Sequence, residues 1–269
     1  MAHPFFDVPR PTVIGHRGAA GEAPENTLVS FERALADGAA ILESDVHLTR
    51  DGVPVLIHDD AVDRTTNGSG RVAAFALEEL RRLDAGHRFT PDAGRSHRFR
   101  GRGHRVPTLQ EAFEAFPMAR FNLELKEKVP GIVERCLEIV AGAGREARTL
   151  LTAGDDALMA DLRARIDAAA LPVAQGASTG DVLAFIRSAI ERTAPSAGPM
   201  ALQVPAEFGD RPLVTPAFVE HAHAHGLFVH VWIVNDPDEM RHLLAMGVDG
   251  IVTDFPAHLG AVVAGATPA

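Results

Sequence analysis

Two carboxylates and a histidine stand close together in residues 41–59, which read ILESDVHLTRDGVPVLIHD. Glu43 and Asp45 follow an apolar run, and because a strand repeats every two residues they project from the same face. Like charges this close resist burial unless a cation or a proton lies between them. A turn at 49–52 reverses the chain, and a second extended run ends at His58. The segment therefore predicts oxygen ligands suited to Mg²⁺ or Ca²⁺ near an imidazole that can transfer protons.

Four more polar residues follow expected strands. His16 and Arg17 stand between two glycines after a short apolar strand, and Glu124 and Lys126 end a strand at 120–125. Glu124 would be a third carboxylate close to Glu43 and Asp45. A divalent cation explains three neighbouring carboxylates better than packing does, since unpaired buried charge is costly. The alternative is a salt-bridge cluster in which Arg17 and Lys126 neutralise the carboxylates.

Together these side chains indicate cleavage of a phosphate ester. His16 and His58 would have pKa values near the working pH, so one can take a proton from the nucleophile and the other can give one to the leaving oxygen. Arg17 and Lys126 supply positive donors that suit an anionic group, most naturally a phosphate. A metal beside them would neutralise the substrate's charge.

The elements that must position these residues alternate regularly. Strands are expected near residues 13, 43, 122, 150, 173, 203, 230 and 251. Helices are expected over 27–37, 77–83, 132–141, 156–168, 181–192, 216–226 and 237–247, with another opened by a capping box of Thr108 and Glu111. Eight strand-helix units predict a (β/α)8 barrel, with an open doubly wound sheet as the alternative. In such a barrel the chemistry lies where the strands end, which is where these polar residues fall.

Residues 59–107 interrupt the alternation after the second strand. Their second half is poor in apolar residues and carries six arginines, Arg88, Arg95, Arg98, Arg100, Arg102 and Arg105. Charge runs usually face water, so a solvated insertion is the first interpretation. The alternative is a rim that attracts anionic substrates.

Composition excludes some classes of protein. The 269 residues carry a formal net charge of -10, which argues against a nucleic-acid binder. The single cysteine, Cys136, cannot form an internal disulfide and is expected to be a small buried hydrophobe. No apolar stretch approaches the length of a membrane span. A cytoplasmic protein is therefore expected, and its oligomeric state is not indicated.

Seven motifs in order make the chain resemble the glycerophosphodiester phosphodiesterase family. They are His16-Arg17-Gly18, Pro24-Glu25-Asn26-Thr27, Glu43-Ser44-Asp45-Val46, Thr49-Arg50-Asp51-Gly52, His58-Asp59, Glu124-Leu125-Lys126 and Gly250-Ile251-Val252-Thr253-Asp254-Phe255-Pro256.

The resemblance implies one TIM-barrel domain over residues 1–269 with a small insertion at about 59–107. It also implies hydrolysis of small glycerophosphodiesters to glycerol 3-phosphate and an alcohol with one divalent cation, Mg²⁺ or Ca²⁺, with Mn²⁺ also an option. Carried across, the acid-base pair is His16 and His58, Arg17 contacts the phosphate and Lys126 adds charge. The metal ligands are Glu43, Asp45 and Glu124, and Trp232 packs against the glycerol side.

Several other polar residues are given lesser roles. His221 and His225 share a helix face but lack a third zinc ligand, so an exposed face is favoured. His230 is either an inner barrel residue or a substrate contact. Asn235 and Asp236 are interpreted as a helix cap, Asp254 as a structural hydrogen-bonding residue, and Gln203 as a weak candidate for substrate contact.

Two other functions stay in competition. A phospholipase D-like enzyme acting on lysophospholipids or sphingomyelin would be favoured by apolar loops at the barrel mouth. A non-catalytic metal or phosphate-ester binding protein would be favoured by substitution of either histidine, and both histidines are present.

Overall fold

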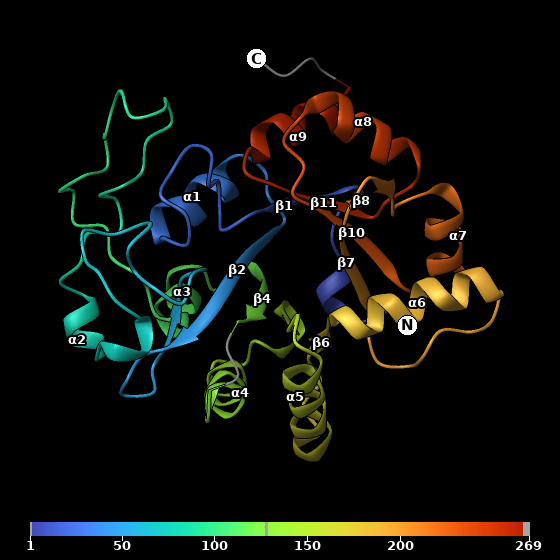
Figure 1. The fold of residues 1–269 in the computed structure, drawn as a ribbon, viewed down its shortest axis with the longest axis horizontal. Coiled ribbons are helices and arrows are strands. Elements are labelled where there is room, and N and C mark those ends of the chain that lie inside the picture. Colours follow the sequence, from blue (N-terminus) through green and yellow to red (C-terminus); the bar gives the residue numbers. More distant parts are fainter. Residues whose placement is uncertain (1, 127–128, 266–269) are drawn as a thin grey trace.

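In the computed structural model, which describes residues 2–126 and 129–265, eight parallel strands form a nearly closed barrel with helices around it (Figure 1). Around the barrel they are β6 (Ala174–Gln175), β5 (Thr149–Thr152), β4 (Arg120–Leu125), β2 (Ile41–Leu48), β1 (Thr12–Gly15), β11 (Gly250–Thr253), β10 (Phe228–Trp232) and β7 (Ala201–Pro205). The strands β6 and β7 are the two ends of this order. Between them, the Met200 amide donates to the Gln175 carbonyl at 2.8 Å. The predicted (β/α)8 barrel is confirmed.

The helices begin and end close to the predicted positions. They are α1 (Leu28–Ala36), α2 (Leu77–Leu80), α3 (Leu109–Ala115), α4 (Ile132–Gly142), α5 (Asp156–Ala169), α6 (Thr179–Glu191), α7 (Pro216–Ala224), α8 (Pro237–Ala245) and α9 (Pro256–Val263). The predicted capping box of Thr108 and Glu111 is present at the start of α3. Three differences stand out: α2 is shorter than expected, and neither α9 nor the hairpin of β8 (Glu207–Phe208) and β9 (Arg211–Pro212) was predicted. No helix within the described ranges is both long enough and apolar enough to span a membrane.

The barrel strands alternate between an inner and an outer face. On β4, Phe121, Leu123 and Leu125 are buried in the cluster that packs the helices against the barrel, so Asn122 and Glu124 point inward. Cys136 on α4 is buried in the same outer cluster, as expected for a small hydrophobe. The strand period thus turns Asn122 and Glu124 into the barrel interior.

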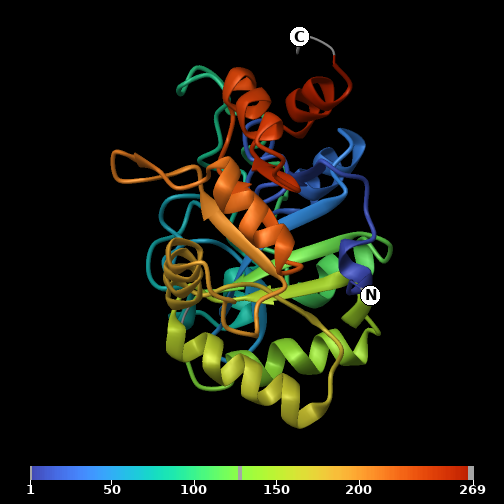
Figure 2. The same cartoon turned by 90° about the vertical axis from the view of Figure 1, so that its right-hand side faces the viewer.

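A short 3₁₀ helix, η1 (Pro4–Phe6), closes the end of the barrel opposite the β8–β9 hairpin (Figure 2). Phe5 and Phe6 are buried in a cluster with inward-facing strand residues such as Ile14 and Ile41. The Phe6 ring stacks on Phe228 with centroids 4.0 Å apart. The barrel interior is therefore apolar at this end and polar at the other.

Residues 59–107 follow β3 (Pro54–Leu56), which pairs antiparallel with the outer end of β2. This insertion includes η2 (Val72–Ala74) and α2, and has a small core of its own, in which Val62, Val72 and Leu80 are fully buried. All six arginines of its second half are exposed, as a solvated insertion predicts.

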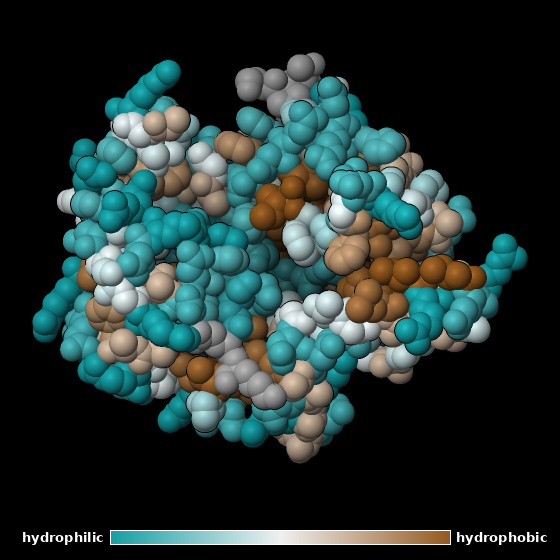
Figure 3. Space-filling model, in the orientation of Figure 1, coloured by the Kyte–Doolittle hydropathy of each residue, from teal (hydrophilic) through white to brown (hydrophobic). Residues whose placement is uncertain are grey.

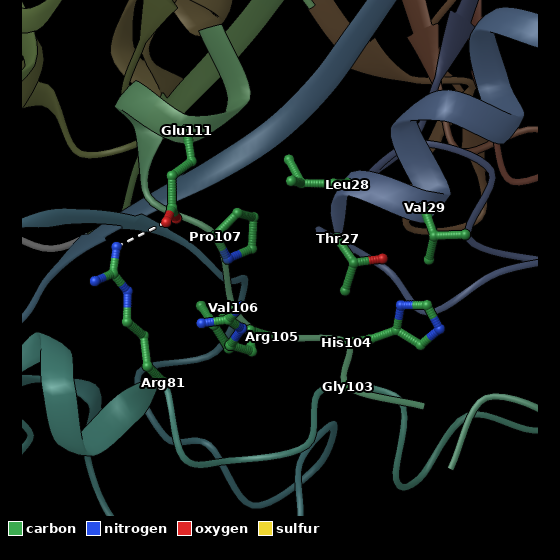
Figure 4. Close-up of a pocket in the computed structure, with 10 residues that line it drawn as sticks. All are labelled: Thr27, Leu28, Val29, Arg81, Gly103, His104, Arg105, Val106, Pro107 and Glu111. Carbon is green, nitrogen blue, oxygen red and sulfur yellow. Dashed lines mark hydrogen bonds and ion pairs between the residues drawn. The ribbon is translucent and has the colours of Figure 1, made fainter. Parts of the chain in front are cut away.

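The insertion packs against the barrel helices around a cavity of about 180 Å³ (Figure 4). Thr27 and Leu28 from the start of α1 face residues 103–107 across it, and Arg81 of the insertion pairs with Glu111 of α3 at 2.7 Å. The insertion is thus fixed to the barrel next to the end of β1.

Candidate active site

The three predicted carboxylates lie on neighbouring strands at the carboxyl ends of the barrel. Asp45 on β2 is level with Glu124 on β4, and Glu43 is level with Asn122 one step deeper. Asp45 is 2% exposed, whereas the Glu124 side chain is 33% exposed. Burial and the charge of Asp45 raise the pKa of Glu43 to about 7. The like charges therefore conflict, as the sequence suggested.

Two cationic side chains lie among these carboxylates. The Lys126 ammonium is 3.1 Å from Glu124 Oε2 and 3.5 Å from Asp45 Oδ1. The Arg17 Nε is 3.3 Å from Asp45 Oδ2, and the Arg17 backbone amide donates to Glu43 Oε2 at 3.0 Å. Burial alone would lower the pKa of Lys126, but Glu124 and Asp45 outweigh it and raise that pKa. The salt-bridge interpretation is thus realised in this arrangement.

His16 is held by residues from the opposite end of the sequence. Its Nδ1–H donates to Asp254 Oδ1 at 2.7 Å, and the Asn235 amide donates to Asp254 Oδ2 at 2.7 Å. Burial would lower the pKa of His16, but the bond to Asp254 and the charge of Glu43 outweigh it and raise that pKa. This fixes the ring through Nδ1 and leaves Nε2, which has no hydrogen bond within the described ranges, for proton transfer.

His58 is held in a similar way by its neighbour in the chain. Its Nδ1–H donates to Asp59 Oδ1 at 2.7 Å, and the Lys126 ammonium is 3.4 Å from its Nε2. The hydrogen bonds of Asp59 to Arg64 and His58 outweigh its burial and hold the pKa of this carboxyl far below its usual range. Both predicted catalytic histidines therefore have a carboxylate on the ring nitrogen away from the site.

Residues of the turn before α1 form hydrogen bonds with Asp45 and Arg17 in the barrel mouth. The Asn26 amide donates to Asp45 Oδ2 at 3.0 Å and accepts from the Ser44 hydroxyl at 2.6 Å. Glu25 accepts from Arg17 Nη1 at 2.8 Å. Asn26 adopts a left-handed conformation with φ 55°, which asparagine tolerates better than most residues. Asp45 and Arg17 are thus fixed by side chains on the same turn.

The donor set suits a hard divalent cation, although its present geometry is one of ion pairs. Among residues 2–126 and 129–265, no cluster of three His, Cys, Asp or Glu side chains is arranged to hold a metal ion, and Lys126 and Arg17 contact the carboxylates instead. A cation would nevertheless relieve the repulsion among three carboxylates, one of which, Glu43, has a pKa raised by burial and by the charge of Asp45. The metal site stays a prediction.

The remaining candidates fall into separate places. Trp232 ends β10, two strands beyond β1 in the barrel order, and is 43% exposed. His230 on the same strand is 2% exposed, and burial lowers its pKa to about 4, which fits an inner barrel residue. Buried Gln203 Oε1 has no hydrogen-bond partner among the described residues, so its substrate contact stays a prediction.

The helix-cap interpretation was half wrong. Asp236 does cap α8, but the Asn235 carboxamide binds Asp254 and the Thr253 hydroxyl. Because Asn235 orients the partner of His16, it belongs to the site. Glu25, Asn26, Asp59 and Arg64 were also missed as site residues, whereas Asp254, predicted to be a structural hydrogen-bonding residue, does bind His16 and Asn235. All but Arg64 stand within the quoted motifs, which were the available signal.

The face that carries the mouth is hollowed at its centre (Figure 3). Hydrophilic residues border the hollow on the side of the insertion, and hydrophobic residues gather on the opposite side. Phe208 on the β8–β9 hairpin is 74% exposed, and Trp232 and Ile233 are 43% and 42% exposed. These three residues, Phe208, Trp232 and Ile233, form an apolar rim of the kind that would favour the lysophospholipid alternative.

Paired histidines, cationic side chains and carboxylates at the carboxyl ends of barrel strands define a TIM-barrel hydrolase of phosphate esters. Residues 16–258 match the glycerophosphoryl diester phosphodiesterase family. The chain belongs to this family, and the predicted enzyme class is confirmed.

Individual relatives cover nearly the whole chain. A glycerophosphodiester phosphodiesterase of Caldanaerobacter subterraneus subsp. tengcongensis is 34% identical over 92% of this chain and 95% of the relative. A human lysophospholipase D is 26% identical over 91% of this chain and 84% of the relative. The structure of an Oleispira antarctica phosphodiesterase in complex with the product sn-glycerol-3-phosphate has a TM-score of 0.76, with 27% identity over 95% of this chain and 97% of that chain.

Proposed function

We propose that the protein hydrolyses small glycerophosphodiesters to glycerol 3-phosphate and an alcohol, with His16 and His58 as the acid-base pair. The observation that carries this proposal is that two imidazoles, each oriented by a carboxylate, share one barrel mouth with Arg17 and Lys126. The names of the relatives, one of which is described with sn-glycerol-3-phosphate as its product, support the substrate class.

The two histidines have different surroundings, which favours different proton roles. An ammonium can only donate, so in the contact with Lys126 the His58 Nε2 is the acceptor, which is the role that a general base needs. His16 has a raised pKa and so favours the protonated form. We assign His58 to remove the proton from the attacking oxygen and His16 to protonate the departing alcohol. The bond from phosphorus to the attacking oxygen forms as the bond to that alcohol breaks.

Glu43, Asp45 and Glu124 would hold one divalent cation, with Mg²⁺ or Ca²⁺ favoured by three carboxylate oxygens. Such an ion would supply positive charge to the phosphate and lower the repulsion from Asp45 that, together with burial, raises the pKa of Glu43. Neutralising the carboxylates in this way would release Arg17 and Lys126 to donate to the phosphate oxygens.

The decisive experiment measures release of glycerol 3-phosphate from glycerophosphocholine and glycerophosphoethanolamine, with EDTA and after restoring Mg²⁺, Ca²⁺ or Mn²⁺. We expect product that is lost with chelator and returns with metal. Glu43→Gln should lower both turnover and metal affinity, measured by calorimetry, whereas Glu220→Gln on the exposed face of α7 should lower neither. Absence of product with every metal would reject the proposed substrates.

The apolar rim favours a second candidate, a lysophospholipid whose acyl chain lies against Phe208, Trp232 and Ile233. The relative named lysophospholipase D gives this candidate independent support. Competition between glycerophosphocholine and lysophosphatidylcholine for one preparation distinguishes the two. A higher kcat/KM for lysophosphatidylcholine than for glycerophosphocholine would support the second candidate and reject the first.

A further inference from the structure

One arginine of the insertion lies between the supports of two different site residues. The Arg64 guanidinium donates through Nε and Nη2 to Asp59 at 2.6 and 3.1 Å. Through Nη1 and Nη2 it donates to both oxygens of Glu25 at 2.6 and 2.7 Å. All three nitrogens of Arg64 are thus engaged, in two bidentate pairs.

Each carboxylate that Arg64 holds is itself bound to a predicted site residue. Asp59 accepts from His58 at 2.7 Å, and Glu25 accepts from Arg17 at 2.8 Å. Asp59 and Glu25 would otherwise repel each other, since both stay charged: the pKa values of both carboxyls are lowered by their arginine and histidine partners, which outweigh burial at Glu25. Arg64 therefore joins the histidine and the phosphate-binding arginine through one rigid planar group.

The geometry separates this contact from an ordinary surface ion pair. The Arg64 side chain is 46% exposed, and a pair so accessible adds little to stability. Its two bidentate contacts fix directions, because the guanidinium plane sets the angles of both carboxylates. A lysine at this position would keep the charge but could not grip both carboxylates in this way.

We propose that Arg64 is a positioning residue that sets the orientation of His58 through Asp59 and of Arg17 through Glu25. The insertion is then part of the catalytic apparatus, supplying the link between two elements of the barrel mouth. This inference rests on the proposed function for its kinetic effect, while its structural effect on the His58 ring is independent of the substrate.

Kinetics of Arg64→Ala and Arg64→Lys on glycerophosphocholine test the proposal. Removing a group that orients a catalytic residue commonly lowers activity by about 10–100-fold. We therefore expect Arg64→Ala to lower kcat/KM by about that factor and Arg64→Lys to lower it by less. The matched control is Arg50→Ala, since Arg50 is 56% exposed and binds Glu79 and the Ala74 carbonyl away from the mouth. The kcat/KM of Arg50→Ala should stay within about twofold of that of the unaltered protein.

Two further readouts separate positioning from a loss of folded structure. Free guanidinium at low millimolar concentration should restore part of the activity of Arg64→Ala, because the site is half-exposed, and urea should not. In a double-mutant cycle, Arg64→Ala should cost less in the Asp59→Asn background than in the unaltered protein. Additive effects and no rescue would overturn the proposal.

Imidazole nitrogen NMR gives a test that needs no activity. The His58 signals, assigned by their loss in His58→Ala, should show an Nδ1–H tautomer that becomes a mixture in Arg64→Ala and is unchanged in Arg50→Ala. An unchanged tautomer in Arg64→Ala would reject the Arg64 inference even where hydrolysis is found. A shifted tautomer in a protein that hydrolyses no glycerophosphodiester would support the inference and reject the proposed function.

Discussion

The two sides of the barrel mouth are built in opposite ways. On the side of β1, β2, β4 and the insertion, the cationic side chains Arg17, Lys126 and Arg64 are each held by carboxylate partners. On the side of β7, its hairpin and β10, the large side chains Phe208 and Trp232 stand exposed.

This difference separates two tasks. Charged groups with fixed partners are pre-organised for a reaction whose charge changes at one phosphorus atom. Exposed apolar groups with open surface can gain contact area only from the part of a substrate beyond the phosphate. We therefore expect changes on the first side to alter turnover for every substrate, and changes on the second to alter the choice among alcohol groups.

The largest effect is expected from removing either histidine on the polar side. His16→Ala and His58→Ala should each lower kcat by about 10²–10⁴-fold, the usual contribution of a positioned acid or base. Binding of glycerol 3-phosphate, measured by calorimetry, should change far less, because Arg17 and Lys126 remain. His242→Ala on the exposed face of α8 is the control. Turnover that survives in either site variant would contradict the acid-base assignment.

A smaller and selective effect is expected on the apolar side. Phe208→Ser should lower kcat/KM for lysophosphatidylcholine by about 3–10-fold, since a partly exposed ring contributes about 1 kcal/mol of contact. The value for glycerophosphocholine should stay within about twofold of the original. Met118→Ser provides a match, because Met118 is similarly exposed but precedes β4, at the amino end of that strand. Equal losses on both substrates would mean that the two sides do not divide these tasks.

The smallest effect on activity is expected at His230, which is buried deep in the barrel on the apolar side and affects stability instead. Burial lowers its pKa from 6.5 to about 4, so on acidification the unfolded chain takes up a proton before the native protein does. Native stability contributed by this group is present above pH 6.5 and falls by about 1–3 kcal/mol toward pH 4. Urea unfolding across this range should give a shallower pH dependence for His230→Asn than for the original protein. Parallel curves would show that His230 does not titrate as described.

The sequence predicted the barrel because its signals are local. Apolar runs, capping residues such as Thr108 and helix-starting prolines such as Pro216 mark each unit without reference to distant residues. The β8–β9 hairpin escaped prediction because residues 205–215 show no alternation and are interrupted by Pro212.

The site could be predicted only as far as strand ends bring residues together. His16, Glu43, Asp45 and Glu124 come together because β1, β2 and β4 are neighbours: His16 follows β1, Glu124 is next to last in β4, and Glu43 and Asp45 lie within β2. The partner of His16 required knowledge of side-chain direction across a long gap, since Asp254 is 238 residues from His16. Arg64 reaches Glu25 across 39 residues from an insertion whose conformation no periodicity specifies. Whether the carboxylates face a metal or Lys126 likewise depends on rotamers, which strand spacing leaves open.

The barrel closes at the seam between its two end strands, β6 and β7, and this seam should make the apolar side easier to open than the polar side. The strand β6 has two residues. Near it the Met200 amide donates to the Gln175 carbonyl, whereas the other neighbouring strands of the barrel are joined by longer hydrogen-bonded ladders. Local openings of the native barrel should start at this seam, because fewer backbone hydrogen bonds must break together. Amide exchange would then be faster near Met200 than along β2 and β4. The barrel could widen toward a bulky alcohol group while the atoms that surround the phosphate keep their places.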